Sequence, residues 1–399
     1  MGSPRHWFIR STPAKSALYF VRHPRGAYLL GCTGGHLCPE FLAAPLNMKN
    51  RAHSVLVILP NAIGDIVVSL PMLEAISRAG WLCDVVIDEA ATGLGRLYAP
   101  WVNRELSLPV KRWRRTSILS DLRKRLTVTA SVRRNRYEAL ICMSGVGSLS
   151  AWLAIAAGIP IRVTEKRRES APFKRIFRRF IFSHRLDFGN DCNNRRTTHV
   201  AAQYMALLKP LGINIPLEED RILQRAPHGR IFVGDRKVPR VLIAPEASET
   251  GRSLPLQEVI AIVNGLREAS RNLDISTVGL PGGIAYQAAR ELGLPAGIGL
   301  SLDALVDAIA RSHCVIAVDS GPGHIAAACG VPLVSIFGPG NPVTFRPLGD
   351  TSNTVLLSKH LACQPCLENG CRGSGRAECL VDLPIMEIID AALQFLRID

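Results

Sequence analysis

The stretch Val315–Pro339, VIAVDSGPGHIAAACGVPLVSIFGP, constrains the fold of this chain more than any other. Its first four residues are an apolar run with the length and composition of a buried parallel strand. Ser320 is a favourable N-cap for a small-residue helix over His324–Cys329, and Gly330 and Pro332 would end that helix. Leu333–Phe337 then reads as a second strand. The stretch therefore predicts one strand–helix–strand unit of a parallel sheet.

The turn between the first strand and the helix carries the residues that can bind a ligand. The N-terminus of the helix should lie at the carboxyl edge of the sheet, where open α/β sheets bind ligands. Its free N–H groups, uncrowded by two glycines, can cradle a phosphate. A well-packed turn without a ligand is the alternative, but it does not need this much polarity. The candidate binding residues are Asp319, Ser320, Gly321, Pro322, Gly323 and His324.

A second unit of the same kind begins near the start of the chain. Ser54–Leu59, SVLVIL, predicts a strand, and a helical pattern runs over Ile66–Arg78. Asp65 lies between them at the start of the helix, where the helix dipole favours a carboxylate. Geometry alone leaves open whether Asp65 caps the helix or takes part in chemistry.

Hydrophobic periodicity predicts further strands and helices along the chain. The expected strands are 139–142, 241–244 and 274–279, and the expected helices are 199–211, 256–268, 302–310 and 385–396. Residues 1–50 show no sustained helix or strand period, and we expect a basic extension that is disordered or precedes a translation start at Met48. The polar, irregular stretch 218–240 predicts a domain boundary.

The two turn motifs, DSGPGHIAAACGVPLVSIFGP and PNAIGDIVVSLPMLEAI, resemble those of glycosyltransferase family 9, the lipopolysaccharide heptosyltransferases. The resemblance extends over roughly residues 54–396. It implies an α/β protein of the GT-B fold, in which two Rossmann-like domains face a central cleft. The implied organisation is an acceptor domain at 51–222, a nucleotide-sugar donor domain at 238–384 that includes a Cys-rich loop at 363–379, and a terminal helix at 385–399 that packs back on the first domain.

The resemblance also implies roles for individual residues. Asp65 matches the family's proposed catalytic base, and Ser248 and Arg252 match its phosphate-contacting positions. Family members often place a Glu after the strand at 274–279 for the nucleotide ribose, but this chain has no acidic residue there before Glu291. Candidate acceptor-binding residues are Asn61, Gly64, Arg112 and Arg136.

The activity that the resemblance implies is inverting glycosyl transfer that needs no metal cofactor. The favoured reaction moves heptose from ADP-heptose onto a lipopolysaccharide core or a related cell-surface glycan. The alternatives are another nucleotide sugar, a protein acceptor, or a basic scaffold without catalysis that binds nucleic acid or membrane. A dinucleotide-dependent oxidoreductase would require a G-x-G-x-x-G after the first strand, where Gly64 stands alone.

The positive charge of the chain is concentrated in two windows. The net charge is +15, and the windows 111–136 and 162–185 carry local charges of +9 and +7. Either window could be a solvated basic face, but together they favour a polyanionic partner. Phe and Arg interleave over 172–182, which suits either an anionic membrane surface or a helix packed on the core. We expect an anionic glycolipid acceptor, a peripheral position on the cytoplasmic face of the bacterial inner membrane, and no specific nucleic acid.

Four cysteines near the C-terminus form the pattern C-x2-C-x4-C-x7-C. Thiolates so spaced could hold a structural Zn or Fe ion, and free thiols or disulfides are the alternatives. The resemblance does not separate these possibilities, because family members with a similar loop differ in metal binding. The candidate ligands are Cys363, Cys366, Cys371 and Cys379.

Overall fold

The computed structural model divides the chain into two compact units, Met1–Arg51 and Ala52–Asp399. The residues that it describes are 17–23, 26–32, 53–108, 118–143, 153–166, 179–188, 198–214 and 238–396. In the first unit, β1 (Ala17–His23) and β2 (Gly26–Cys32) pair antiparallel, from Ala17 opposite Cys32 to His23 opposite Gly26. The expectation of no strand in residues 1–50 was therefore wrong, because both segments carry enough aromatic and aliphatic residues to pair.

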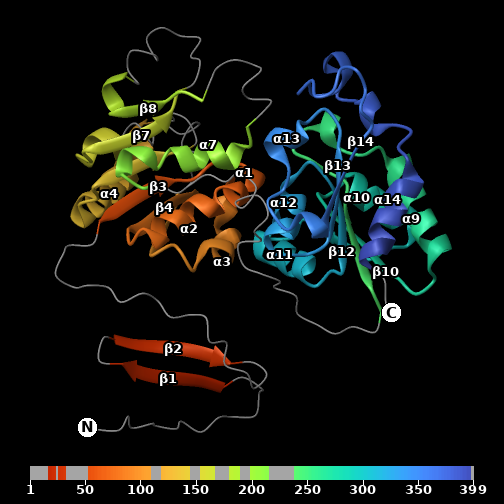
Figure 1. Ribbon diagram of the computed structural model, residues 1–399, viewed down its shortest axis with the longest axis horizontal. Helices are drawn as coiled ribbons and strands as arrows, with labels where there is room; N and C mark the ends of the chain where they lie inside the picture. The colour runs from red at the N-terminus through yellow and green to blue at the C-terminus, as the bar shows by residue number, and fades with distance from the viewer. Residues whose placement is uncertain are drawn as a thin grey trace. The chain divides into compact units, whose positions relative to one another are not determined.

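The second unit contains two six-stranded parallel sheets (Figure 1). The first sheet has the strand order β5-β4-β3-β6-β7-β8, and the second has the order β11-β10-β9-β12-β13-β14. Both orders follow the doubly wound pattern, in which the strand order reverses beside the first strand of the sheet. The predicted α/β class with two Rossmann-like units is confirmed. The strands of the first sheet are β3 (Ser54–Ile58), β4 (Leu82–Asp88), β5 (Arg104–Leu108), β6 (Ala139–Cys142), β7 (Ile161–Glu165) and β8 (His184–Leu186).

The first sheet is covered by helices whose starts follow local sequence signals. The predicted helix over Ile66–Arg78 is divided at Ser69, because Pro71 occupies the first turn of a new helix. Residues 111–117 of the first basic window and 167–178 of the second lie outside the described residues. The helical segments of this half are α1 (Ile63–Val68), α2 (Leu70–Arg78), η1 (Glu89–Leu94), α3 (Gly95–Tyr98), α4 (Ile118–Asn135), α7 (Val200–Ala206) and η4 (Lys209–Leu211).

The second sheet matches the sequence-based expectations closely. The strands 274–279 and 333–337 and the helix 302–310 have the predicted bounds. Its strands are β9 (Arg240–Ala244), β10 (Asp274–Gly279), β11 (Ala296–Ile298), β12 (Cys314–Val318), β13 (Leu333–Phe337) and β14 (Thr354–Ser358). Its helices are α9 (Leu256–Ala269), α10 (Ile284–Leu292), α11 (Leu302–Ala310), α12 (Gly321–Ala328), α13 (Pro342–Phe345) and α14 (Ile385–Phe395), with short 3-10 turns η5 (Thr250–Arg252), η6 (Thr351–Asn353), η7 (Cys371–Gly373) and η8 (Glu378–Leu380).

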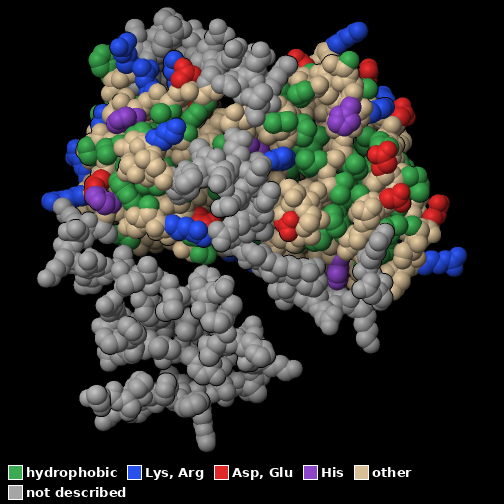
Figure 2. Space-filling model, in the orientation of Figure 1, with side chains coloured by type: hydrophobic (Ala, Val, Ile, Leu, Met, Phe, Trp, Pro, Cys, Tyr) green, Lys and Arg blue, Asp and Glu red, His purple; other side chains and the backbone are tan. Residues whose placement is uncertain are grey.

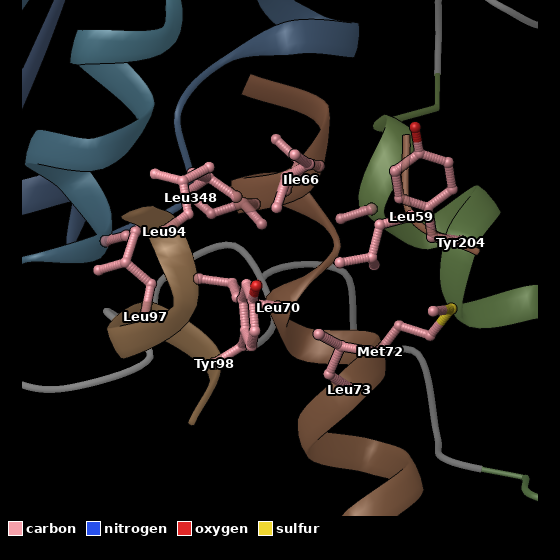
Figure 3. Packing of buried hydrophobic residues seen from close by; sticks show 14 of the residues in the cluster. Leu59, Ile66, Leu70, Met72, Leu73, Leu94, Leu97, Tyr98, Tyr204 and Leu348 are labelled. Atoms are coloured by element: carbon pink, nitrogen blue, oxygen red, sulfur yellow. The ribbon is translucent and has the colours of Figure 1, made fainter. Parts of the chain in front are cut away.

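One buried cluster joins the two halves of this unit. It runs from Ile66 and Leu70 on the first half to Ile325 and Leu348 on the second. Figure 3 shows Leu348 close to Ile66 and Leu94. Burial of apolar side chains is the main stabilising contribution to such a contact, so the two halves pack on each other through a common core.

The terminal helix α14 does not pack where we expected it. Its buried residues Ile388, Ile389, Ala391 and Ala392 belong to the core on the second sheet, together with residues of α9. Figure 1 shows α14 beside α9. The prediction that it packs back on the first domain was wrong, because its apolar stripe is covered by α9 and by strands β12 and β13. Among the described residues, no helix is long and apolar enough to cross a membrane.

Candidate functional site: a pocket between two helix N-termini

Two strand–helix turns, one from each sheet, face each other. The first joins β3 to α1, and the second joins β12 to α12, as the sequence predicts. Glycines allow the close approach: a Cβ on Gly64 would lie 2.9 Å from Cδ2 of His324, and a Cβ on Gly321 would lie 2.9 Å from Cγ2 of Ile63. Because Cβ atoms are essentially never found at such distances, larger residues at these positions would push the two helices apart.

A pocket of about 540 Å³ opens at this contact. Its walls come from both halves of the unit, and they combine charged groups, glycines and apolar side chains. One wall includes Asn61, Ile63, Gly64, Asp65 and Val68, and the opposite wall includes Glu246, Ser248, Arg252, Val278, Gly279, Leu300, Asp319, Ser320, Gly321, Pro322, His324 and Phe345. A volume of this size and a lining of this kind suit a small polar ligand such as a nucleotide.

Arg252 supplies the positive charge of the pocket. Its guanidinium donates to the Ser248 hydroxyl at 3.2 Å and lies 3.6 Å from the Asp319 carboxylate and 3.4 Å from that of Glu249. The planar guanidinium is suited to binding phosphate oxygens through paired hydrogen bonds. Arg252 ends the short turn η5, so its position depends on what holds that turn.

Asp319 lies at the end of β12 and is only 7% exposed. Burial raises the pKa of this carboxyl to about 6, and Arg252 offsets part of that rise. Asp65 and Glu249 raise it further by charge repulsion, so the two opposed carboxylates Asp65 and Asp319 influence each other across the pocket. A Cβ on Gly340 would lie 2.3 Å from Oδ2 of Asp319, so the β13–α13 turn packs tightly against this side chain.

The first turn of α12 carries polar atoms without partners in the described part of the chain. Ser320 occupies the N-cap position, but its hydroxyl makes no capping hydrogen bond and is buried. Nδ1 of His324 is also buried without a partner. Burial, followed by repulsion from His199 and Arg252, lowers the pKa of His324 to about 4, so the ring is neutral at physiological pH. Unpaired buried polar groups cost free energy, which a polar ligand in the pocket would recover.

The Cys-rich loop contacts the turn that carries Arg252. The N–H of Gly251, next to Arg252, donates to Oδ1 of Asn369 at 2.9 Å, and Gln364 donates to the carbonyl of Gly338 at 2.7 Å. A Cβ on Gly251 would lie 2.2 Å from the nitrogen of Gly370, so loop and turn are in close contact. This loop therefore helps to fix the position of Arg252.

The four cysteines of the loop do not form a metal-binding set in this structure. Cys363 is exposed, Cys366 and Cys371 are half-buried, and Cys379 is buried; all are free. Burial, with a smaller contribution from the other three cysteines, raises the pKa of Cys379 to about 11, so this thiol is protonated at neutral pH. Within the described ranges, no group of three or more His, Cys, Asp or Glu is arranged to hold a metal ion. Zn or Fe ligation would require three or more of these thiolates on one point, so the metal site stays a prediction.

Comparison with known proteins shows which enzymes this chain resembles. The model of glycosyltransferase family 9 (heptosyltransferase) matches residues 280–375, which hold the α12 turn and part of the Cys-rich loop. The chain is also 26% identical over 329 residues to lipopolysaccharide heptosyltransferase 1 of Pseudomonas aeruginosa, an alignment that covers 79% of this chain and 87% of the relative.

The chain is a glycosyltransferase that resembles family 9.

Solved structures agree with this glycosyltransferase in fold. The E. coli ADP-heptose lipopolysaccharide heptosyltransferase II superposes with a TM-score of 0.62 at 18% identity, covering 86% of this chain and 98% of the other. E. coli heptosyltransferase WaaC with ADP gives a TM-score of 0.61 at 18% identity, covering 76% and 92%. The predicted GT-B fold is confirmed.

Most of the predicted site residues of the glycosyltransferase meet in the pocket, but Gly323 and Arg136 do not. Gly323 packs toward the sheet, where an added Cβ would lie 3.5 Å from the Cβ of Ala317. Arg136 is exposed and precedes β6, so it lies at the amino edge of the first sheet, whereas Asp65 lies beyond the carboxyl end of β3. Arg112 lies outside the described residues. The structure thus separates Arg136 from the other candidates, because parallel strands keep their two ends at opposite edges.

Sequence reasoning assigned no role to two residues that line the pocket, Glu246 and Phe345. Glu246 had a usable signal, since it follows the apolar strand β9 at the carboxyl edge of the sheet, where ligands bind. Phe345 had no such signal, because it lies in a short helix far along the chain from the other pocket residues.

Proposed function

We propose that this glycosyltransferase transfers a heptosyl group from ADP-heptose to a lipopolysaccharide core or a related cell-surface glycan. The observation that carries this proposal is the pocket in which Arg252 and the N-terminus of α12 face Asp65. The names of similar proteins support the choice of donor and acceptor: a lipopolysaccharide heptosyltransferase 1, an ADP-heptose lipopolysaccharide heptosyltransferase II, and a heptosyltransferase with ADP.

The diphosphate of the donor would bind at the second half of the unit. The start of α12 lines the pocket, and the partial positive charge of a helix N-terminus favours phosphate there. Arg252 and the Ser248 hydroxyl lie on the same wall and can donate to phosphate oxygens. These protein groups would stabilise the charge that develops on the departing ADP, and we propose that transfer needs no metal cofactor.

Asp65 would act as the general base of an inverting displacement. As the acceptor hydroxyl oxygen forms a bond to the anomeric carbon, the bond from that carbon to the diphosphate oxygen breaks and the hydroxyl proton passes to Asp65. The position of Asp65 supports this role, since it lines the pocket from the half that faces the diphosphate wall. General-base catalysis typically contributes about 10²- to 10⁴-fold in rate.

Surface chemistry supports an anionic, membrane-borne acceptor. The large apolar side chains exposed on the first half include Leu126, Ile155 and Phe180, the last at 79%. Leu126 lies in α4 with the exposed Arg133 and Arg134, and Phe180 follows the exposed Arg179. On the face that Figure 2 draws, most of the acidic side chains lie over the second half. We propose that the first half rests on the cytoplasmic face of the inner membrane, with arginines on lipid phosphates.

Transfer assays test the proposed reaction. The purified protein should release ADP from ADP-heptose when a heptose-free lipopolysaccharide core is supplied, and chelation by EDTA should leave the rate unchanged. Absence of transfer from ADP-heptose to any such core would refute the proposed function. Thermal stabilisation by GDP or UDP but not by ADP would refute ADP-heptose as the donor.

Asp65→Asn tests the base. Turnover should fall about 10²-fold or more, while ADP affinity by calorimetry stays within twofold of wild type. Glu138→Gln is the matched control, because Glu138 pairs with His53 at the opposite edge of the same sheet. An Asp65→Asn turnover rate near that of the control would remove Asp65 as the base.

A further inference from the structure

The carboxylate of Glu246, which follows β9, caps the N-terminus of α10, the helix after the neighbouring strand β10. Glu246 stands just after β9, yet its carboxylate accepts hydrogen bonds from the N–H of Leu280 at 2.9 Å and from that of Ala285 at 2.7 Å. Leu280 follows β10, and Ala285 is the second residue of α10. The helix gets no cap from its own N-cap residue, Gly283, so Glu246 supplies the cap through space.

Two glycines make room for this carboxylate. A Cβ on Gly283 would lie 2.3 Å from Oε1 of Glu246, and a Cβ on Gly279 would lie 2.8 Å from the same atom. Any larger residue at either position would displace the carboxylate. The local structure at the end of β10 is therefore built around the Glu246 side chain.

The pocket thus has two unlike ends. At one end lies the N-terminus of α12, where Ser320 and Nδ1 of His324 are buried without partners in the described residues. At the other end lies Glu246, whose carboxylate caps the N-terminus of α10. Phosphate is attracted to the first end by Arg252 and the helix dipole, and it is repelled from the second by the carboxylate. This difference favours a nucleoside diphosphate bound with its diphosphate at Arg252 and α12 and its nucleoside toward Glu246.

A carboxylate that already accepts two N–H hydrogen bonds still has free lone pairs. Its two oxygens offer about four acceptor positions in total, so each oxygen of Glu246 can accept one further hydrogen bond from the pocket. Vicinal hydroxyls match such a pair of acceptors, and in doubly wound sheets an acidic side chain at the end of the second strand binds the ribose hydroxyl of a nucleotide. Here β10 is that second strand, although the acidic residue comes from β9.

We infer that Glu246 recognises the ribose hydroxyls of the donor nucleotide and sets its orientation in the pocket. This inference rests on the proposed function, since it requires a nucleoside diphosphate at α12. The neighbouring side chains Val278, Leu300 and Leu302 give this end an apolar wall for the base. Glu291, the first acidic residue after β10 in the sequence, is exposed in the last turn of α10 and does not line the pocket.

Calorimetry with ribose-modified nucleotides tests the inference on the wild-type protein. ADP, GDP and UDP are titrated first, and the 2′-deoxy and 3′-deoxy forms of the nucleotide that binds are compared with it. Loss of one hydroxyl should weaken binding about tenfold, because hydrogen bonds to charged groups are among the strong ones. Equal affinities for the parent and both deoxy forms would overturn the role of Glu246 without touching the proposed function.

The variant Glu246→Gln separates recognition from charge. Removing a negative charge would by itself strengthen the binding of an anion, so the expected tenfold loss of nucleotide affinity has the opposite sign to a general electrostatic effect. Pyrophosphate, which has no ribose, should bind the variant as well as or better than wild type. Glu291→Gln, on the helix that Glu246 caps, is the matched control and should change neither affinity.

The remaining outcomes distinguish the two proposals. Binding of GDP or UDP in place of ADP would refute ADP-heptose as donor, and the deoxy comparison would still decide the role of Glu246. Binding of none of the three would overturn both proposals. Because the wild-type comparison needs no substitution, instability of Glu246→Gln would not prevent the test.

Discussion

Removal of Arg252 should destabilise the protein in a manner that depends on pH. Arg252 faces Asp319 at 3.6 Å, and Asp319 is 7% exposed with a pKa raised to about 6. At pH 7.5 the carboxylate is ionised, so Arg252→Ala leaves a buried charge without its partner. At pH 5 most Asp319 is protonated in the folded protein, so the same substitution should lower the free energy of unfolding only slightly.

The size of the effect follows from the geometry. Two unit charges about 4 Å apart attract by about 4 kcal/mol at an effective dielectric constant near 20. The Arg252 side chain is 29% exposed and is shared with Glu249, so solvent screening reduces this figure, and we expect a loss of roughly 1–2 kcal/mol at pH 7.5. The exposed contact with Glu249 adds little.

Asp319 itself gives the wild-type protein a pH dependence of known sign. Its pKa in the folded protein, about 6, is above its ordinary value of 3.8. Such a group contributes stability that is fully present below pH 3.8 and is lost as pH rises through about 6. At about 1.4 kcal/mol per pKa unit, the loss amounts to about 3 kcal/mol.

Urea-induced unfolding of the wild type and Arg252→Ala at pH 5 and pH 7.5 measures the difference. The double variant Arg252→Ala/Asp319→Asn is the control, because it has no Asp319 carboxylate to leave unpaired. Its free energy of unfolding should therefore not include the cost of an unpaired buried charge at either pH. A destabilisation by Arg252→Ala that is equal at the two pH values, within about 0.5 kcal/mol, would contradict an ion pair between these residues.

Two other substitutions probe packing and polar contacts at opposite edges of the sheets. Tyr137→Phe removes the hydroxyl that donates to the buried Asp84 carboxylate, and it should lower the free energy of unfolding by about 1.5–3 kcal/mol in urea titrations. ADP affinity should not change, since this pair lies at the amino edge of the first sheet; a loss of stability below about 0.5 kcal/mol would show that the hydrogen bond contributes little. Gly340→Ala places a Cβ 2.3 Å from the Asp319 carboxylate, and it should cost about 1–3 kcal/mol in stability and weaken ADP binding in calorimetry. Gly323→Ala, whose added Cβ would meet its nearest atom at 3.5 Å, is the matched control, and equal stabilities of the two variants would contradict the close packing at Gly340.

Local patterns in the sequence predicted most of the second sheet and both ligand-facing turns. The strand Leu333–Phe337 and the helix Leu302–Ala310 have the bounds that their hydrophobic patterns predict. The strand is buried on both faces and reads as a continuous apolar run, whereas the helix buries one stripe and shows apolar residues at helical spacing. The helix α12 begins at Gly321 instead of His324, because Pro322 is tolerated in a first turn. The predicted helix over 199–211 becomes α7 followed by a 3-10 turn at Pro210.

Some expectations failed because they depended on which surfaces meet. The apolar stripe of α14 could cover either half, and only the packing of α9 and the second sheet decided between them. Arg136 is close in sequence to a central strand, but it precedes that strand and so lies at the edge away from Asp65. The spacing of the four cysteines allowed a metal site, yet the described residues hold no group of three or more ligands arranged for a metal ion.

The sequence by itself determined that two strand–helix turns, with Asp65 in one and Asp319 in the other, belong to parallel sheets. Those features depend on neighbours within about ten residues, so a local pattern records them. Only the tertiary structure decided that the turns face each other across one pocket and that Glu246 reaches the N-terminus of α10, 39 residues further along the chain. Contacts of that kind depend on the order of strands in the sheet, and no local period in the sequence encodes that order.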